Sequence, residues 1–382
     1  MKKLIKIFSI LLIVLLCGCS QKEVVEKEEE TVELPPLEYS FSMIMAGDSL
    51  IHSGVYADAY NGTTYDFGKM LTSIKPIIQK YDLAFINQET IIGGKALGYS
   101  SYPRFNTPDQ IGDTLIDVGF DIFNLANNHT LDKGEAGMLY SLSYWAGKNV
   151  TTVGMNSSFE ERDTIETYEK NGITYAILGY TTVTNGLRVP AGKEYYLNVY
   201  DSERVAQDVA KVKDLVDVVM VSMHYGSEYT HTPTFEQTEI ANYLASLDVD
   251  VVIGHHPHVI QPITYIDDTL VIYSLGNFLS GQIGLNKQIG MLASFDVRKV
   301  VDGENVEVTI ENVRGDLIYT HYNYYNGRYS NYYVYPFNEL NDSILPNYKT
   351  YEASYGSIIG EYNPNILVNT YNWGWYNDRN TK

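Results

Sequence analysis

The chain has 382 residues, enough to bury a sizeable hydrophobic core, and carries a formal net charge of -20. Because nucleic-acid phosphates are bound mainly through Lys and Arg, this acidic balance argues against a nucleic-acid partner. The two cysteines, Cys17 and Cys19, both lie close to the N-terminus. The sequence after them therefore contains no disulfide and no cysteine-ligated metal site.

The N-terminus has the pattern of an export signal. A basic start is followed by the apolar run 7–16, which is shorter than the about 20 residues that span a bilayer. The string Leu16-Cys17-Gly18-Cys19 resembles a lipobox, which implies cleavage before Cys19 and lipidation of its thiol. We therefore expect residues 1–19 to be a lipoprotein signal that anchors the protein to the extracellular face of the cell membrane. A simple signal peptide and a signal anchor are the alternatives.

The next segment, residues 20–38, is polar and rich in glutamate, and it contains Pro35-Pro36. Such a segment cannot bury enough apolar surface to fold by itself. We predict a disordered tether that reaches about 25 Å from the membrane.

From residue 39 onward, short apolar runs alternate with helical patterns. The predicted strands cover residues 41–46, 83–87, 122–125, 174–180, 218–223 and 249–253. The predicted helices cover residues 67–81, 134–148, 201–215 and 234–247. Thr107 followed by Pro108 predicts a further helix start, with Thr as the N-cap and Pro in the first turn. The string Thr234-Phe235-Glu236-Gln237 predicts a capping box.

After residue 260 the pattern changes to strands joined by turns, at 260–266, 270–274, 291–297 and 306–313. This order predicts an α/β sandwich of two facing sheets flanked by helices, over residues 39–315. Residues 316–382 form a Tyr- and Asn-rich extension. Aromatic packing of a C-terminal β extension is the simpler interpretation of this segment, and a polymer-binding surface is the alternative.

Polar side chains follow five of the predicted strands, at the edge where α/β sheets bind ligands. A single buried His or Asn is usually a hydrogen-bonded structural group, but five successive strand ends at one pole indicate a site. Oxygen and imidazole donors without thiolate suit Zn, Mn or Fe, and more than four donors suit two divalent ions. The five segments are Gly47-Asp48, Asn87-Gln88-Glu89, Asn127-Asn128-His129 with Asp132, His224-Tyr225-Gly226, and Gly254-His255-His256-Pro257-His258.

These motifs are similar to those of calcineurin-like metallophosphoesterases. Over about residues 40–300 the chain more closely resembles the CapA-type poly-γ-glutamate capsule family, also through His224-x-Gly226-x-Glu228-Tyr229 and Tyr273-Ser274-Leu275-Gly276-Asn277-Phe278. The resemblance implies a calcineurin-like sandwich. The sequence departs from the metallophosphoesterase pattern where Leu50 replaces the first-motif His and where Glu89 is the nearest substitute for the bridging Asp. It departs from the CapA-type pattern where Tyr225 stands in place of the usual Trp.

The resemblance also implies roles for individual residues. One ion would be held by Asp48 and His258, with Glu89 bridging or reaching it through water, and the second by Asn128, His224 and His256.

His129 would protonate a leaving group or bond a phosphate oxygen, with Asp132 orienting its ring. His255 is an alternative ligand. Arg104 would clamp a phosphate or carboxylate of the substrate, or it is an ordinary surface residue.

The sequence is compatible with three functions. The first is a metal-dependent hydrolase at the cell surface that cleaves a phosphoester or an amide-like polymer bond. The second is a non-catalytic accessory subunit of a membrane synthase that serves biosynthesis or export of an anionic surface polymer or its precursor. The third is a solute-binding lipoprotein, a class that does not require His and Asn at five successive strand ends.

Overall fold

The structure, a computed structural model, describes residues 35–370. The predicted signal peptide, the lipidation site Cys19 and nearly all of the predicted tether lie outside the described residues. Within residues 35–370, no helix combines the length and the apolar character that a membrane crossing requires.

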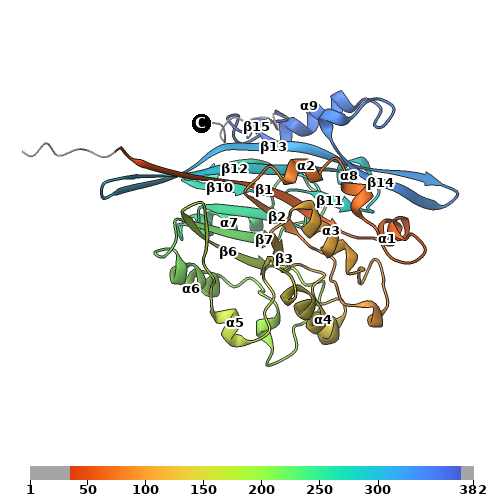
Figure 1. Cartoon of the computed structure of the whole chain (residues 1–382), viewed down its shortest axis with the longest axis horizontal. Coiled ribbons are helices and arrows are strands. Elements are labelled where there is room, and N and C mark those ends of the chain that lie inside the picture. Colours follow the sequence, from red (N-terminus) through yellow and green to blue (C-terminus); the bar gives the residue numbers. More distant parts are fainter. Residues whose placement is uncertain (1–34, 371–382) are drawn as a thin grey trace, which may run out of the picture. The chain divides into compact units, whose positions relative to one another are not determined.

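The described residues form two β-sheets (Figure 1). The larger sheet contains, in spatial order, β14 (Arg328–Pro336), β13 (Asn305–Tyr325), β12 (Ile289–Asp302), β1 (Leu37–Leu50), β2 (Leu83–Asn87), β3 (Ile122–Asn124) and β4 (Thr151–Val153). Strands β1 to β4 are parallel to one another, whereas β12, β13 and β14 are antiparallel. Two short strands join this sheet, β11 (Asn277–Ser280) beside β1 and β15 (Leu367–Val368) beside β13.

The second sheet supplies the other half of the sandwich. Its spatial order is β5 (Tyr168–Lys170), β6 (Ile173–Thr181), β7 (Val218–His224), β8 (Val251–His255), β10 (Thr269–Ile272) and β9 (Ile263–Ile266). Strands β6, β7, β8 and β10 are parallel. The expected two-sheet α/β sandwich is therefore confirmed.

The strands are apolar on both faces because each sheet packs against the other sheet on one face and against helices on the other. Met43 and Met45 of β1 face Met220 and Ile253 in a cluster between the two sheets. The alternating residues, such as Ile44, lie in a different cluster on the outer face. This period-two division is what strand geometry imposes on a sheet buried on both sides.

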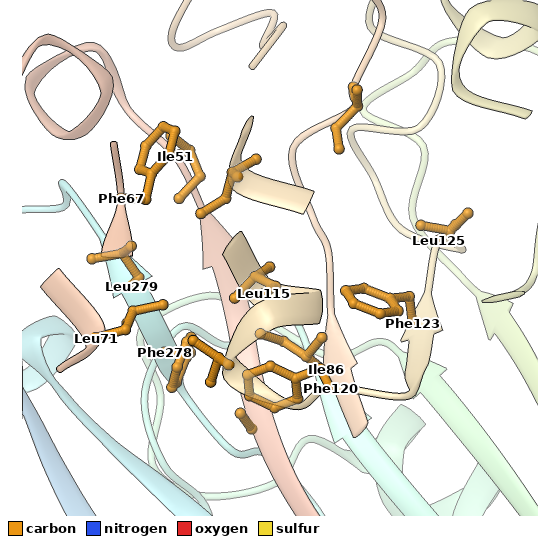
Figure 2. Close-up of a cluster of buried hydrophobic side chains, with 14 of the residues drawn as sticks. Ile51, Phe67, Leu71, Ile86, Leu115, Phe120, Phe123, Leu125, Phe278 and Leu279 are labelled. Atoms are coloured by element: carbon orange, nitrogen blue, oxygen red, sulfur yellow. The ribbon is translucent and has the colours of Figure 1, made fainter. Parts of the chain in front are cut away.

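Helices cover the two outer faces. The larger sheet is covered by α1 (Ser53–Ala59), α2 (Lys75–Ile78), α3 (Gln110–Val118) and α4 (Gly134–Ala146), with the 3-10 turns η1 (Gly68–Leu71) and η2 (Lys95–Leu97) nearby. Figure 2 shows this cluster, in which the rings of Phe120 and Phe278 meet edge to face with centroids 5.5 Å apart. The second sheet is covered by α6 (Ser202–Val212) and α7 (Phe235–Ala245).

The remaining helical segments are short, apart from α9 (Tyr348–Ile359), which lies beside β13 (Figure 1). They are α5 (Phe159–Asp163), α8 (Leu285–Gln288), η3 (Glu194–Tyr196) and η4 (Phe337–Glu339). Strand β13 passes through residue 315, so the first part of the Tyr-rich segment continues the larger sheet.

Two helix predictions are wrong in detail. The single helix expected over 67–81 is divided into η1 and α2, because Pro76 lacks an N–H and is accommodated only in the first turn of a new helix. Thr107 does not cap a helix, since α3 begins three residues later and the Thr107 hydroxyl has no hydrogen-bond partner among the described residues. The capping box at Thr234 and Gln237 is confirmed.

An ion pair joins the two sheets at the edge opposite the parallel strand ends. Asp217 Oδ2 accepts hydrogen bonds from Lys299 Nζ of β12 at 2.8 Å and from the Thr174 N–H and hydroxyl at 2.8 and 2.9 Å. Burial alone would raise the pKa of Asp217, but the bonds from Lys299 and Thr174 outweigh it and lower this pKa.

We predict that Asp217→Asn lowers the free energy of unfolding at pH 7 by about 1–3 kcal/mol. Because the native pKa is lowered, the carboxylate stabilises the fold above its unfolded pKa of about 4 and loses this effect as the pH falls through the native value. Denaturant unfolding should therefore show the variant converging with the wild type below about pH 4. The exposed Asp214→Asn is the control, and an equal loss in both variants would contradict the assignment.

Candidate functional site

The polar residues of the site continue the inward-facing rows of the strands. On β2 the apolar Phe85 is followed at two-residue intervals by Asn87 and, just beyond the end of the strand, by Glu89, and on β7 Met220 is followed by Ser222 and His224. Because alternate residues face the same side, each row turns from apolar to polar at its carboxyl end. The parallel strands of both sheets thus deliver ligand-type side chains to one place between the sheets.

On β1 a bulge corrects the direction of Asp48. Met43 and Met45 face the sheet interface, so uninterrupted alternation would turn Asp48 outward. The pairing with β2 shifts between Ala46 and Asp48, which restores the inward direction. The Gly276 backbone packs directly against residue 47. Only glycine fits at this position, because a Cβ there would lie 1.9 Å from the Gly276 carbonyl oxygen.

One group of donors contains Asp48, Glu89 and His258, which offer ligand atoms within 4.8 Å of one another. Asp48 Oδ2 lies 3.0 Å from His258 Nδ1, and Glu89 Oε1 lies 3.7 Å from His258 Nε2. Asn87 Nδ2 donates to Asp48 Oδ1 at 2.8 Å and fixes this carboxylate from behind.

A second group gathers around His224 Nε2. This atom lies 3.1 Å from Asn128 Oδ1, 3.1 Å from His256 Nδ1 and 3.8 Å from Glu89 Oε1. Glu89 therefore belongs to both groups. The pairing of Asp48 with His258, and of Asn128 with His224 and His256, is the division that the family resemblance implies.

The segment after β8 is held in an unusual backbone conformation. His256 and His258, on either side of Pro257, have φ angles of +98° and +57°. Residues other than glycine rarely adopt these backbone angles. Each such residue costs about 1–3 kcal/mol and persists where its surroundings enforce it, which is common at functional sites. The conformation brings both imidazoles to the same cluster.

The protonation states of His224 and His256 suit metal binding. Burial lowers the pKa of His224 well below its usual range and that of His256 to about 4, with neighbouring histidines adding to the shift. Neutral imidazole is the form that binds metal ions. Burial opposes a charge on His258, but the Glu89 and Asp48 carboxylates outweigh this effect and raise its pKa to about 9.

Glu89 provides the test of whether these residues fit a cation. Its side chain is fully buried, and neither carboxylate oxygen has a hydrogen-bond partner in the described part of the chain. Burial raises the pKa of Glu89 well above its usual range. Ligand atoms about 2.1 Å from one tetrahedral ion lie roughly 3.4 Å apart. The separations of 3.1 to 3.8 Å around Glu89 and His224 fit a divalent ion on this basis.

His129 and Asp132 form a hydrogen-bonded pair beside the donor groups. His129 Nδ1 lies 2.7 Å from Asp132 Oδ2, which also accepts the Phe105 N–H at 2.7 Å. The His129 ring packs edge to face on Phe105 with centroids 4.7 Å apart. Asp132 therefore fixes the ring orientation and leaves Nε2 available for proton transfer.

Two further candidates from the sequence, Arg104 and His255, differ in their contacts with the donor groups. Arg104 is exposed, and no ion pair joins its guanidinium to the site among the described residues. His255, ranked below His256 from the sequence, is fully buried, stacks on Phe85 and has its Nδ1 3.7 Å from Asp48 Oδ1. Neither of its ring nitrogens has a hydrogen-bond partner among the described residues.

Two further residues lie at the site without an assigned role from the sequence. Glu228 is partly exposed and offers an oxygen 4.0 Å from His258 Nε2, so it approaches the histidines from the solvent side. Asn277 Oδ1 lies 3.1 Å from His258 Nδ1. Both residues belong to motifs that carry the family resemblance, which indicates a position near the site but gives neither residue a role.

Comparison with known proteins identifies the family. The model of the bacterial capsule synthesis protein PGA_cap matches residues 42–282. The PGA biosynthesis protein CapA of Bacillus subtilis is 33% identical over 187 residues, which cover 48% of this chain and 49% of that protein. The capsule biosynthesis protein CapA of Bacillus anthracis is 27% identical over 186 residues, 48% of this chain and 45% of that protein. The chain thus spans about half the length of these relatives.

Solved structures with a similar arrangement include a putative 5'-nucleotidase of Staphylococcus aureus, with a TM-score of 0.49 and 14% identity over 82% of this chain and 58% of that one. A calcineurin-like phosphoesterase of Bacillus subtilis has a TM-score of 0.45 and 14% identity, over 74% of this chain and 91% of that one. The family assignment depends on the sequence match, which covers more than half of the chain: this protein belongs to the bacterial capsule synthesis protein PGA_cap family.

Proposed function

We propose that this protein is a lipid-anchored cell-surface component of poly-γ-glutamate or related capsule production, and that its site is a metal-dependent hydrolase centre. The observation that carries the hydrolase proposal is Glu89, a buried carboxylate without hydrogen-bond partners, placed between two groups of imidazole and carboxylate donors. A buried carboxylate without hydrogen-bond donors is costly unless a cation neutralises it.

Two divalent ions would be held by the residues already described, with Glu89 shared between them. Bound ions of this kind supply Lewis-acid activation of water and of the bond to be cleaved. The chain itself supplies the proton transfer. His129 Nε2 donates a proton to the leaving group, while Asp132 Oδ2 holds Nδ1 and stabilises the charged ring.

A non-catalytic accessory role is the second candidate. Two Mycobacterium tuberculosis relatives, described as probable polyglutamine synthesis accessory proteins, are 24% identical over 228 residues, 53% of this chain and 57% of theirs. In that case the centre would bind carboxylates of an anionic polymer or its precursor through metal, beside subunits of a membrane synthase. Turnover by metal-loaded protein separates the two functions.

We predict that Glu89→Gln weakens metal binding by more than about 100-fold, since even outer partners of metal ligands contribute about 10–100-fold. In chelator the same variant should unfold at a higher temperature than the wild type, because the buried carboxylate without hydrogen-bond donors is gone. Elemental analysis and thermal unfolding with and without EDTA measure both effects. The exposed Glu169→Gln is the control, and unchanged metal content in Glu89→Gln would exclude this centre.

We predict that His129→Ala lowers kcat by about 10²–10⁴-fold without changing the metal content, and that Asp132→Asn gives a smaller loss. The substrates to compare are a chromogenic phosphodiester and a γ-glutamyl amide. His52→Ala is a matched control, because the His52 ring packs on Phe105 with centroids 5.0 Å apart but lies outside the donor groups. Equal losses in His52→Ala and His129→Ala would indicate a packing role alone.

We predict that Cys19→Ser moves the protein from the membrane fraction to the soluble exported fraction, because the hydroxyl cannot form the lipid thioether. Cell fractionation and incorporation of labelled fatty acid measure this change. Membrane attachment that persists in Cys19→Ser would instead favour a signal anchor.

A further inference from the structure

Tyr229 is held beside the metal-donor groups at the mouth of the site. It is 45% exposed and has a φ angle of +66°, and its N–H donates to the Pro257 carbonyl at 2.8 Å. Its ring centroid lies 6.1 Å from that of His258, with 31° between the planes. A strained residue that presents a half-exposed ring beside a candidate ligand suggests a contact surface for a substrate.

Lys287 lies over the ring of Tyr229. Its Nζ lies 4.7 Å from the centroid of Tyr229, within the range of a cation–π interaction. Unlike Lys69, Lys193 or Lys299, it forms no ion pair with a carboxylate among the described residues. The chain as a whole has a net charge of -20 and repels anions. An ammonium group without an ion-pair partner next to the site can therefore attract an anion to this particular place.

Asn277 fastens this lysine to the candidate metal site. Its Oδ1 lies 3.1 Å from His258 Nδ1, while its Nδ2 donates to the Lys287 carbonyl at 2.8 Å and to Gln282 Oε1 at 3.0 Å. Gln282 Nε2 in turn donates to the Tyr229 hydroxyl at 3.3 Å. One amide side chain thus links His258 directly to the Lys287 backbone and, through Gln282, to the Tyr229 hydroxyl.

The surroundings limit which anion fits. Glu228 adjoins Tyr229 and approaches His258 Nε2 to 4.0 Å, so a dianion beside Lys287 would meet a carboxylate as well. A single ammonium group balances one monoanionic carboxylate. The part of the Tyr229 ring that remains exposed suits a short aliphatic segment next to that carboxylate, because aromatic rings bury methylene groups well.

We propose that Tyr229 and Lys287 form a substrate-recognition platform that binds a carboxylate-bearing chain of the oligo-γ-glutamate type beside the metal-donor groups. This inference deepens the proposed function and rests on it. Lys287 pairs with a side carboxylate of the chain, Tyr229 packs on the methylene groups next to it, and Asn277 acts as a positioning residue for the platform.

The test compares Lys287→Met, Lys287→Arg and Tyr229→Leu with the wild type in isothermal titration calorimetry, using metal-loaded protein without the anchor. The probes are a synthetic oligo-γ-glutamate and, separately, inorganic phosphate. Lys349→Met is the matched control, because Lys349 Nζ also lies over a tyrosine ring, 6.0 Å from the centroid of Tyr348, but outside the site. Metal content is measured for every variant.

We expect Lys287→Met and Tyr229→Leu to weaken oligo-γ-glutamate binding by about tenfold at low salt, and Lys287→Arg to restore most of it. The metal content of the variants, and the affinity of Lys349→Met for oligo-γ-glutamate, should remain as in the wild type.

Equal affinity of Lys287→Met and the wild type for the oligomer, with metal retained, would overturn the platform while leaving the metal centre intact. Lys287-dependent binding of phosphate but not of the oligomer would overturn the carboxylate assignment. Loss of metal in the wild type itself would count against the proposed function.

Discussion

The carboxylate of Glu89 lies between His224 and His258 with no hydrogen-bond donor of its own in the described part of the chain. A charge in this position is acceptable to the fold only if a cation accompanies it. The surrounding features are consistent with that requirement. The histidines nearby have lowered pKa values, with the exception of His258, which pairs with Asp48.

The sandwich makes this arrangement possible because it joins two sets of parallel strands. Asp48 and Glu89 come from the larger sheet, while His224 and His256 come from the second sheet. Neither sheet alone holds a complete set of donors. The apolar cluster between the sheets fixes their spacing, and the same inward-facing rows that build this cluster end in the ligand-type residues. The packing between the sheets and the assembly of the site therefore both depend on the same inward-facing residues at every second position of the strands.

Much of the fold and the site followed from the sequence, because parallel strands leave a simple signal. Apolar runs followed by Asp, Asn or His predicted the two sheets and placed Glu89 and His224 correctly at strand ends. The helix over 67–81 was less predictable, since its apolar periodicity continues through Pro76 while its backbone hydrogen bonds cannot. The bulge at Gly47 was also hidden, because it depends on the approach of Gly276 from a distant segment.

The distinction between His255 and its neighbours shows a second limit. Strand β8 extends to residue 255, two residues beyond its predicted end, so His255 continues the inward row of Ile253 and stacks on Phe85. Periodicity alone did not reveal where regular strand gives way to the positive φ angles of His256 and His258. The role of Asn277 was equally invisible, since it arises from contacts to Gln282 and Lys287 that form only in the folded chain.

The most direct measurement is anomalous diffraction from crystals of residues 39–382 grown with Mn²⁺ and recorded with X-rays that excite manganese. Two neighbouring anomalous peaks, with Glu89 contacting both, Asp48 and His258 at one, and His224 and His256 at the other, are the predicted result. A map without peaks at these residues, with the Glu89 carboxylate bonded only to protein or water, would contradict the metal centre.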